Sequence, residues 1–385
     1  MEEQLSLSVT DNPHLTFSKE YLVVAQNASG RNLNVPVYRF KGHAPGPKVY
    51  VQSSIHGAEV QGNVVIYQLI QALKTARLKG EIILVPNCNP VGSNQKSGEY
   101  TLGRFDPVNG QNWNRAYHYD AQLIQRFIDK VKPDEILAEI KAEFRAHIKS
   151  GIDEVLSRTW GVGLAQQLNL KLQRFAFDAD IVLDLHNGPV SCRHIYVPEY
   201  ARESAQYFNI PNVILIPNVF AGALDEATFC PWWQLKDALS EKYPKRDWDF
   251  GIEAFTVEMG SQEVIEFTSG AYDAKGILAY LTYKNCFPKD SFLPVEITRY
   301  AVMLKDYKIM YAPTGGIVEY LAQPGVFAKK NSVMARVLNV DELENERAVS
   351  EIKAPCDLIP ILHFPSASVL GGTQLYKCFT EFFEL

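Results

Sequence analysis

The sequence contains few cysteines, and no two of them are spaced like a metal-binding or redox pair. Its six cysteines are scattered along 385 residues without a CxxC motif. This distribution argues against a disulfide framework and against a cysteine-based zinc site, and it suits a reducing compartment. We therefore expect a cytoplasmic protein.

Long apolar runs and dense basic clusters are also missing. No apolar run approaches the roughly 18 residues of a membrane-spanning helix, and the start, MEEQLSLS, is acidic and lacks the apolar core of a secretory signal. Lysine and arginine form no stripe that could follow a phosphate backbone, and the formal net charge is −6. We expect neither a membrane nor a nucleic acid among its partners.

The rest of the composition is that of an ordinary globular protein, with 46% hydrophobic and 21% charged residues. After a hairpin expected over 20–40, apolar stretches typical of strands alternate with stretches of helical periodicity. This alternation predicts an α/β fold with a mixed, mostly parallel central sheet flanked by helices. The expected strands lie near 45–54, 81–90, 179–188, 194–199, 211–219 and 254–260, and the expected helices near 59–77, 121–178 and 269–287.

The chain divides into two expected domains, since it is longer than a typical single domain. Residues 1–290 form the α/β catalytic domain, with a helical insertion near 125–165. From residue 291 the sequence pattern changes to short apolar stretches separated by turn residues, which predicts a small all-β domain over 291–385. The region 91–120 is rich in Gly, Asn, Asp and Pro, and long loops of this kind are often functional.

Four polar residues stand at the ends of the expected strands. His56 and Glu59, in HGAE, follow one strand and open a helix; His186 ends the apolar strand IVLDLH, and Glu258 ends FTVE. Each of these residues taken alone has a structural explanation that needs no metal, such as a carboxylate at a helix N-terminus beside an exposed histidine. Together they match a catalytic zinc site, in which two histidines and a carboxylate hold the ion and a further glutamate acts as base. Asp184 could orient the His186 imidazole, or it could simply end the strand.

Several motifs in this order resemble a known family. They are HGAE at 56–59, NPVG at 89–92, GRFD around Arg104, NWNR with Asn114 and Arg115, LDLH at 183–186, and the ExG at 258–260. The sequence resembles the zinc carboxypeptidase superfamily, and within it the succinylglutamate desuccinylase/aspartoacylase branch. The resemblance covers most of the chain.

The resemblance implies a zinc carboxypeptidase-like fold and one zinc ion held by His56, Glu59 and His186. Glu258 matches the residue that activates the attacking water, and Arg104 matches the arginine that polarises the scissile carbonyl. The same chemistry is plausible from the residues, since a guanidinium near a developing oxyanion gains strength where water is excluded.

Three further residues are candidates for binding substrate. Asn114 and Arg115 match the family's pair that grips the substrate carboxylate, which arginine can hold through two parallel hydrogen bonds. Arg193, seven residues after His186, could bind a second acidic group on the substrate. Alternatively, it could be a solvent-exposed residue of a loop. One position departs from the pattern: many relatives have an aspartate where this chain has Asn112, and an amide can still accept a hydrogen bond from a ligand histidine but carries no charge.

The neighbouring histidines and cysteine are not expected to take part. His118 and His194 are not expected ligands, because three ligands are already assigned. Cys192 is expected to be a small apolar filler, because no base partner is evident.

These observations lead to one functional prediction and two alternatives. We expect a zinc-dependent hydrolase that cleaves the amide bond of a small N-acyl amino acid, a deacylase that could be a homo-oligomer. The alternatives are a zinc metallocarboxypeptidase acting on peptides and a non-catalytic protein that binds carboxylates.

Overall fold

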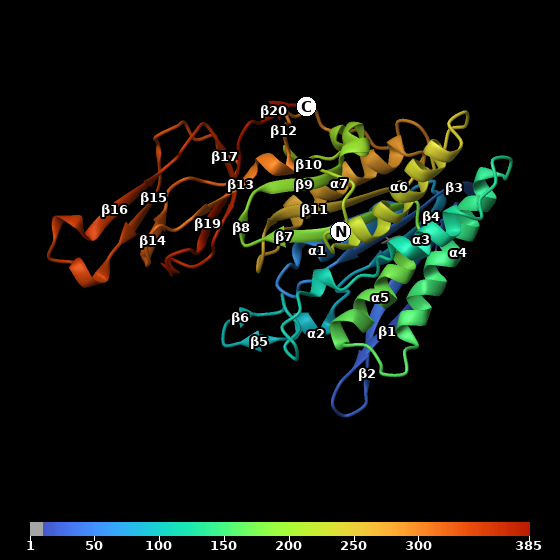
Figure 1. Ribbon diagram of the computed structural model, residues 1–385, viewed down its shortest axis with the longest axis horizontal. Coiled ribbons are helices and arrows are strands. Elements are labelled where there is room, and N and C mark those ends of the chain that lie inside the picture. The colour runs from blue at the N-terminus through green and yellow to red at the C-terminus, as the bar shows by residue number, and fades with distance from the viewer. Residues whose placement is uncertain (1–10) are drawn as a thin grey trace, which may run out of the picture.

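The computed structural model describes residues 11–385; the first ten residues, on which the expectation of no secretory signal rests, lie outside the described part. The protein consists of an α/β body with a β unit at one end (Figure 1). Within residues 11–385, no helix has both the length and the apolar character needed to cross a membrane.

A ten-stranded sheet runs through the body. Its strands are Leu15–Gln26 (β1), Asn32–Gly42 (β2), Ala44–Ser53 (β3), Lys79–Val85 (β4), Ile181–Gly188 (β7), Arg193–Pro198 (β9), Asn212–Ile216 (β10), Glu253–Ser261 (β11), Tyr300–Met303 (β12) and Phe383–Glu384 (β20). Their order across the sheet is β1-β2-β4-β3-β7-β11-β9-β10-β12-β20. The central strands β4, β3, β7 and β11 are parallel, whereas β1, β2 and β20 pair antiparallel toward the edges. The predicted fold class is therefore confirmed.

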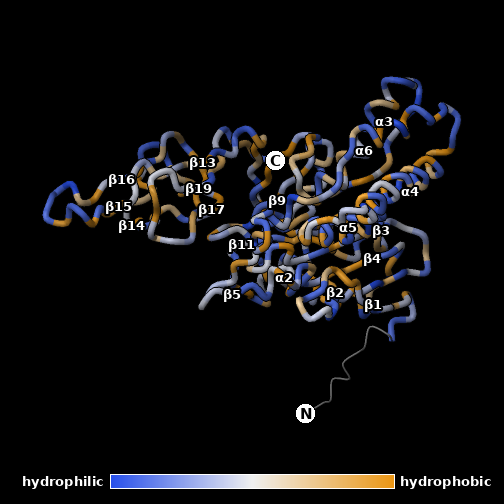
Figure 2. The backbone as a smooth tube through the Cα atoms, turned by 60° about the horizontal axis from the view of Figure 1, so that its bottom comes forward, coloured by the Kyte–Doolittle hydropathy of each residue, from blue (hydrophilic) through white to orange (hydrophobic). Residues whose placement is uncertain are grey.

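Helices cover both faces of this sheet. Their bounds are Gln61–Leu73 (α1), Pro90–Ser93 (α2), Ala121–Ile128 (α3), Leu137–Leu156 (α4), Leu164–Ala176 (α5), Leu224–Lys242 (α6) and Phe267–Tyr283 (α7). Neighbouring side chains on a strand point to opposite faces. Val49 and Val51 thus belong to the core beneath α1 and α7, while Tyr50 belongs to the core beneath α5 and α6. Figure 2 shows the apolar segments gathered inside the body.

The helices agree with the sequence pattern except for α6 and the single turn α2, which lies at the start of the expected loop. The stretch 121–178 contains α3, α4 and α5, and the helix expected over 59–77 begins at Gln61 and ends at Leu73. We predicted no element for α6, which contains Pro231 and buries most of its first three turns. A helix buried on several sides lacks the one-sided apolar stripe that marks a surface helix.

The β unit is built from two four-stranded sheets with a small core of their own. Their orders are β13-β19-β17-β8 and β16-β15-β14-β18. The strands are Val190–Ser191 (β8), Tyr307–Tyr311 (β13), Gly316–Tyr320 (β14), Val333–Leu338 (β15), Val349–Lys353 (β16), Ile359–His363 (β17), Ser368–Val369 (β18) and Gln374–Phe379 (β19). The short strand β8 comes from the body and pairs with β17, which fixes the unit beside the end of β7.

The chain passes between the two parts more than once. β12 belongs to the central sheet, the β unit follows, and β20 returns to pair with β12 at the sheet edge. The domain boundary near residue 290 stays a prediction. Within the loop 91–120, a small hairpin is formed by Lys96–Ser97 (β5) and Tyr100–Thr101 (β6), followed by a 3₁₀ turn at Trp113–Arg115 (η2).

Candidate metal centre and its pocket

Three neighbouring parallel strands deliver the polar residues singled out in the sequence. His56 follows β3, His186 lies near the end of β7, and Glu258 lies near the end of β11. Because β3, β7 and β11 are adjacent and parallel, their carboxyl ends meet at one edge of the sheet. That edge is where ligands bind in open α/β sheets.

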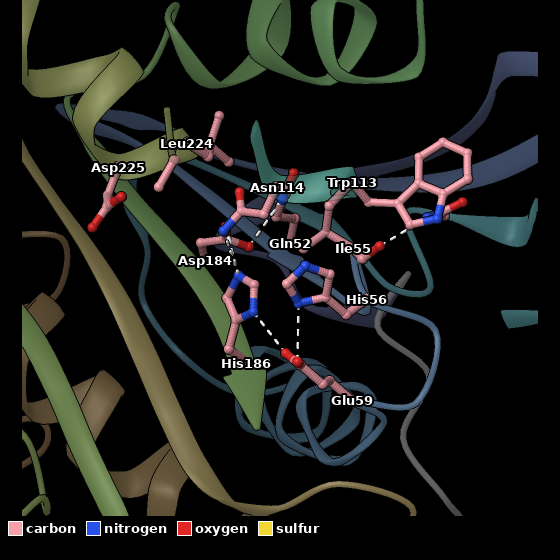
Figure 3. Close-up of polar contacts among 12 residues, drawn as sticks. Gln52, Ile55, His56, Glu59, Trp113, Asn114, Asp184, His186, Leu224 and Asp225 are labelled. Atoms are coloured by element: carbon pink, nitrogen blue, oxygen red, sulfur yellow. Dashed lines mark hydrogen bonds and ion pairs between the residues drawn. The ribbon is translucent and has the colours of Figure 1, made fainter. Parts of the chain in front are cut away.

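His56, Glu59 and His186 form one buried cluster (Figure 3). The Nδ1 atom of His56 lies 2.9 Å from Glu59 Oε1, and the Nδ1 atom of His186 lies 2.7 Å from Glu59 Oε2. One ligand atom from each of the three residues lies within 4.8 Å of the other two. The structure therefore brings together the three residues that the sequence predicted as ligands.

The far side of each imidazole has its own acceptor. His56 Nε2 lies 2.8 Å from Asn112 Oδ1, and His186 Nε2 lies 2.9 Å from Asp184 Oδ2. If each Nε2–H donates to that oxygen, each Nδ1 keeps its lone pair toward Glu59, which is the tautomer a metal ligand needs. Asn112 thus accepts through its amide oxygen, as we expected of it in place of an aspartate.

The charges around the cluster set the protonation of its members. Burial alone would lower the pKa of His186, but Asp184 and Glu59 outweigh burial and raise this pKa well above the usual histidine range. For His56, burial dominates and lowers the pKa. Burial acts to raise the pKa of Glu59, yet the two imidazoles hold it well below its ordinary value.

This donor set fits a divalent metal ion. Metal–ligand bonds of about 2.0–2.1 Å in a tetrahedron place neighbouring donor atoms about 3.3 Å apart, and the three candidate ligand atoms lie within 4.8 Å of one another. Two nitrogen donors and a carboxylate are an attested zinc set that leaves one position open. The cluster could therefore hold one metal ion.

Glu258 faces the same pocket but stands apart from the cluster. The pocket has a volume of about 370 Å³, and Glu258 lines it together with His56, Glu59 and His186. Among residues 11–385, the buried Oε2 atom of Glu258 has no hydrogen-bond partner. Burial, helped by the charge of Glu59, raises the pKa of Glu258 to about 7. An unligated carboxylate with this environment can accept and return a proton near neutral pH.

The loop 91–120 brings three more of the predicted residues to this pocket. Arg104 donates from Nη1 to Glu59 Oε1 at 2.9 Å, and half of its side chain remains exposed. Asn114 lies beside His186, with Nδ2 3.4 Å from Nε2. Arg115 donates to the Asn114 carbonyl at 2.6 Å. All three line the pocket.

Arg115 is set against a glycine that leaves it room. Gly222 has a φ of +112°, and a Cβ added there would lie 2.8 Å from Arg115 Cδ. The segment that precedes α6 therefore needs glycine for its backbone conformation. A side chain there would also crowd Arg115.

Arg193 is not brought to this pocket. Its Nε donates to Asp273 Oδ1 at 2.6 Å, and its side chain lines a different cavity. We therefore leave Arg193 out of the proposed substrate-binding residues. The reason is the register of β9, which begins at Arg193 and pairs it with Met259 on the neighbouring strand.

The residues set aside in the sequence lie outside the cluster. His118 packs near α5, where its backbone N–H donates to Gln173 Oε1. His194 is buried, with Nδ1 3.0 Å from the Cys192 carbonyl. Burial raises the pKa of the Cys192 thiol to about 12, so the thiol stays neutral and is a poor nucleophile.

Sequence reasoning missed pocket residues that come from α6 and the β unit. Asp225, in the first turn of α6, is buried in the pocket wall, and Lys377 on β19 and Tyr307 on β13 also line it. Burial lowers the pKa of Lys377, and the charges of Arg104 and Arg115 lower it further, against the opposing effect of Glu258. No motif marks Tyr307 and Lys377, because only the docking of the β unit brings β13 and β19 to the sheet edge, and Asp225 lies on the helix α6 that we did not predict.

The fold and the cluster together define an α/β protein with a candidate metal centre at the carboxyl edge of its sheet. Residues 45–284 match the family model described as the succinylglutamate desuccinylase/aspartoacylase catalytic domain. The chain belongs to the succinylglutamate desuccinylase/aspartoacylase family. Membership supports a deacylase-like hydrolase.

Solved structures of related proteins agree with this placement. A family protein from Shewanella amazonensis SB2B is 45% identical with a TM-score of 0.93, and the match covers 96% of this chain and 100% of that one. A second, from Shewanella frigidimarina NCIMB 400, is 42% identical with a TM-score of 0.92, covering 96% of this chain and 98% of that one.

A more distant likeness concerns the fold alone. The ectoine utilization protein EutE (DoeB) from Ruegeria pomeroyi is 17% identical with a TM-score of 0.63, and the match covers 96% and 97% of the two chains. A comparison with curated proteins found no match.

Proposed function

We propose that this protein is a zinc-dependent hydrolase that cleaves the amide bond of a small N-acyl amino acid. The observation that supports this most is the buried His56–Glu59–His186 cluster beside Glu258, a carboxylate outside the cluster whose buried Oε2 atom has no hydrogen-bond partner among residues 11–385. A protein that only binds carboxylates has no need of such a base, which weighs against the non-catalytic alternative. The cytoplasmic location and the possible homo-oligomer stay predictions.

The roles of the residues follow from their positions. Zinc held by the cluster would supply Lewis-acid polarisation of the scissile carbonyl and of a water molecule. Glu258 removes a proton from the water that attacks the carbonyl carbon. As the C–N bond breaks, the same carboxyl returns the proton to the departing amine nitrogen.

Two arginines and an asparagine are placed to bind the negatively charged groups of the substrate. The Arg104 guanidinium stabilises the negative charge that develops on the carbonyl oxygen, since charge–charge interactions strengthen where water is excluded. Asn114 and Arg115 hold the carboxylate of the amino-acid part. Arg115 presents a planar pair of N–H donors that matches a carboxylate.

The pocket favours a small acylated amino acid over a peptide. Its volume of about 370 Å³ is at the small end of the range for ligand pockets. Residues of the β unit, among them Tyr307, Leu362 and Lys377, form part of its wall. A wall on that side leaves less space for a long peptide, so we place the carboxypeptidase reading second.

The test is a substrate panel on purified protein supplied with zinc. N-acetyl, N-formyl and N-succinyl amino acids are incubated with the enzyme, and release of free amine is measured; a C-terminal peptide series tests the carboxypeptidase alternative. We expect turnover of at least one N-acyl amino acid and little of the peptides. Tight binding without turnover of any compound would favour the carboxylate-binding protein instead.

The Glu258→Gln variant separates catalysis from metal binding. The amide keeps the shape of the side chain but cannot take the proton, so we expect a loss of about 10²–10⁴ in kcat. The zinc content, measured by elemental analysis, should equal that of the unaltered protein because Glu258 is not a ligand. A variant with unchanged kcat would show that the base is another residue.

A further inference from the structure

A second cavity lies behind the catalytic pocket, on the other side of the segment that links β7 to β9. Gly188 and Pro189 of this segment line the catalytic pocket, whereas Ser191, Cys192 and Arg193 line the second cavity. Its volume is about 470 Å³, which is enough for a small metabolite. Gly325 of the β unit also lines it, so the cavity lies at a junction between the two parts of the protein, where ligand sites are common.

Arg193 is the charged group of this cavity, and it is held in place from behind. Its Nε donates to Asp273 Oδ1 at 2.6 Å, and its guanidinium carbon lies 5.3 Å from the centre of the Tyr272 ring. Asp273 is 4% exposed, whereas 28% of the Arg193 side chain is exposed. A buried carboxylate and an aromatic ring thus fix the plane of the guanidinium, which lowers the entropy lost when it binds a ligand.

The outer edge of this guanidinium is free. The guanidinium is ion-paired with Asp273 through Nε, and within residues 11–385 neither Nη atom of Arg193 makes a hydrogen bond with another residue. The paired N–H donors of an arginine match the two oxygens of a carboxylate.

The rest of the lining favours an anion. Thr298 and Tyr300 add hydroxyl groups, and no aspartate or glutamate is among the lining residues that the structure describes. The nearest acid, Asp273, lies behind Arg193 rather than in the wall. The Cys192 thiol in the wall is neutral, because burial raises its pKa to about 12, and it therefore adds no negative charge to the cavity.

We propose that this second cavity is a binding site for a small carboxylate, which Arg193 holds through its two free Nη groups. The site is separate from the catalytic pocket and does not depend on the function proposed above. It lies next to the base-bearing strand, because Arg193 pairs with Met259, the neighbour of Glu258.

The test compares two arginine variants in calorimetric titrations with sodium succinate, using sodium chloride at equal ionic strength as the blank. Arg193→Gln removes the proposed contact, and Arg115→Gln is the matched control in the catalytic pocket. We expect two classes of succinate site in the unaltered protein and a loss of at least tenfold in affinity at one class in Arg193→Gln. That class should persist in Arg115→Gln. Succinate binding to Arg193→Gln that equals binding to the unaltered protein would overturn the proposal.

A second variant controls for misfolding. It is needed because Arg193→Gln leaves the Asp273 carboxylate buried without its cation, which could destabilise the fold. The double variant Arg193→Gln with Asp273→Asn removes both charges together, which is often tolerated in buried pairs. Loss of the same binding class at an unchanged melting temperature supports the site, and retained binding overturns it. A parallel titration with inorganic phosphate tests the ligand class: phosphate binding that is lost in the same variants and is tighter than succinate binding would overturn the assignment to carboxylates.

In these titrations Arg115→Gln tests the catalytic pocket, and Arg193→Gln tests the second cavity. If the proposed function is wrong, the effect of Arg193→Gln on succinate binding is therefore unchanged. If Arg115 binds no carboxylate, that variant titrates like the unaltered protein. The class of site lost with Arg193 still decides the proposal.

Discussion

Asp184 is fully buried behind His186, and each of its carboxylate oxygens accepts from a different side chain. Oδ2 lies 2.9 Å from His186 Nε2, and Oδ1 accepts a hydrogen bond from Gln52 Nε2 at 2.9 Å. Gln52 in turn accepts from the Tyr50 hydroxyl at 3.0 Å. This buried chain of hydrogen bonds fixes the orientation of the imidazole, which is the usual role of the partners behind metal ligands.

At this scale we predict that Asp184→Asn weakens metal binding. An amide offers only one acceptor oxygen, so either Gln52 or His186 would face an NH₂ group and His186 would lose a charged partner. Zinc affinity should fall by roughly 10- to 100-fold, measured by competition with a chelator. Asp225→Asn is the control, since Asp225 lies in the same pocket wall and its Oδ1 accepts from the Glu226 backbone instead. Equal affinities for the two variants would contradict the role of Asp184.

Among the elements, α1 matters most to the site because its first turn follows Glu59 directly. Gly62, in this turn, faces the sheet closely: an added Cβ would lie 2.8 Å from Leu185 Cβ on β7 and would clash with the Ser53 hydroxyl on β3. α1 therefore approaches the two strands that deliver His56 and His186 more closely than a larger side chain permits. This close packing keeps Glu59 between the two imidazoles.

Gly62→Ala should therefore push α1 away from the sheet. We expect a loss of about 1–3 kcal/mol in the free energy of unfolding, the usual cost of overpacking, together with weaker zinc binding. Urea denaturation measures the first and chelator competition the second. Gln71→Ala, on the opposite face of α1, is the control and should change stability by less than about 0.5 kcal/mol. Similar losses in both variants would mean that the close approach of α1 is unimportant.

Across the whole molecule, ion pairs tie the outer helices to the sheet. Asp178, just after α5, pairs with Lys48 on β3 and with Lys149 on α4 at 2.9 Å. Burial acts to raise the pKa of Asp178, but the two lysines outweigh it and lower this pKa to about 2. One carboxylate thus connects a central strand with two helices of the outer layer.

This pairing predicts a stability change in acid. Because the folded-state pKa lies below the unfolded value, the contribution is complete above about pH 4 and disappears as the pH falls through about 2. Since the group is a third exposed, solvent screening limits the effect to about 1 kcal/mol. Denaturation at pH 5 should show Asp178→Asn less stable than the unaltered protein, and the difference should shrink by pH 2.5. A difference that stays constant over this range would contradict the assignment.

The sequence by itself determined the α/β class and pointed to four polar strand-end residues as a candidate metal site. Apolar runs such as IVLDLH could only be buried strands, and polar residues at their ends had to gather at the carboxyl edge of a parallel sheet. The family resemblance then assigned His56, Glu59 and His186 as the ligands and added Arg104, Asn114 and Arg115, and all six residues lie at one pocket.

Only the tertiary structure decided which further residues share the pocket. Arg193 seemed close to the site because it follows His186 by seven residues, but the register of β9 turns it toward a different cavity. Asp225 and Lys377 reach the pocket although they lie far along the chain from its motifs. Helical and strand periods report which face of an element is buried, whereas the meeting of distant elements depends on packing that no local pattern records.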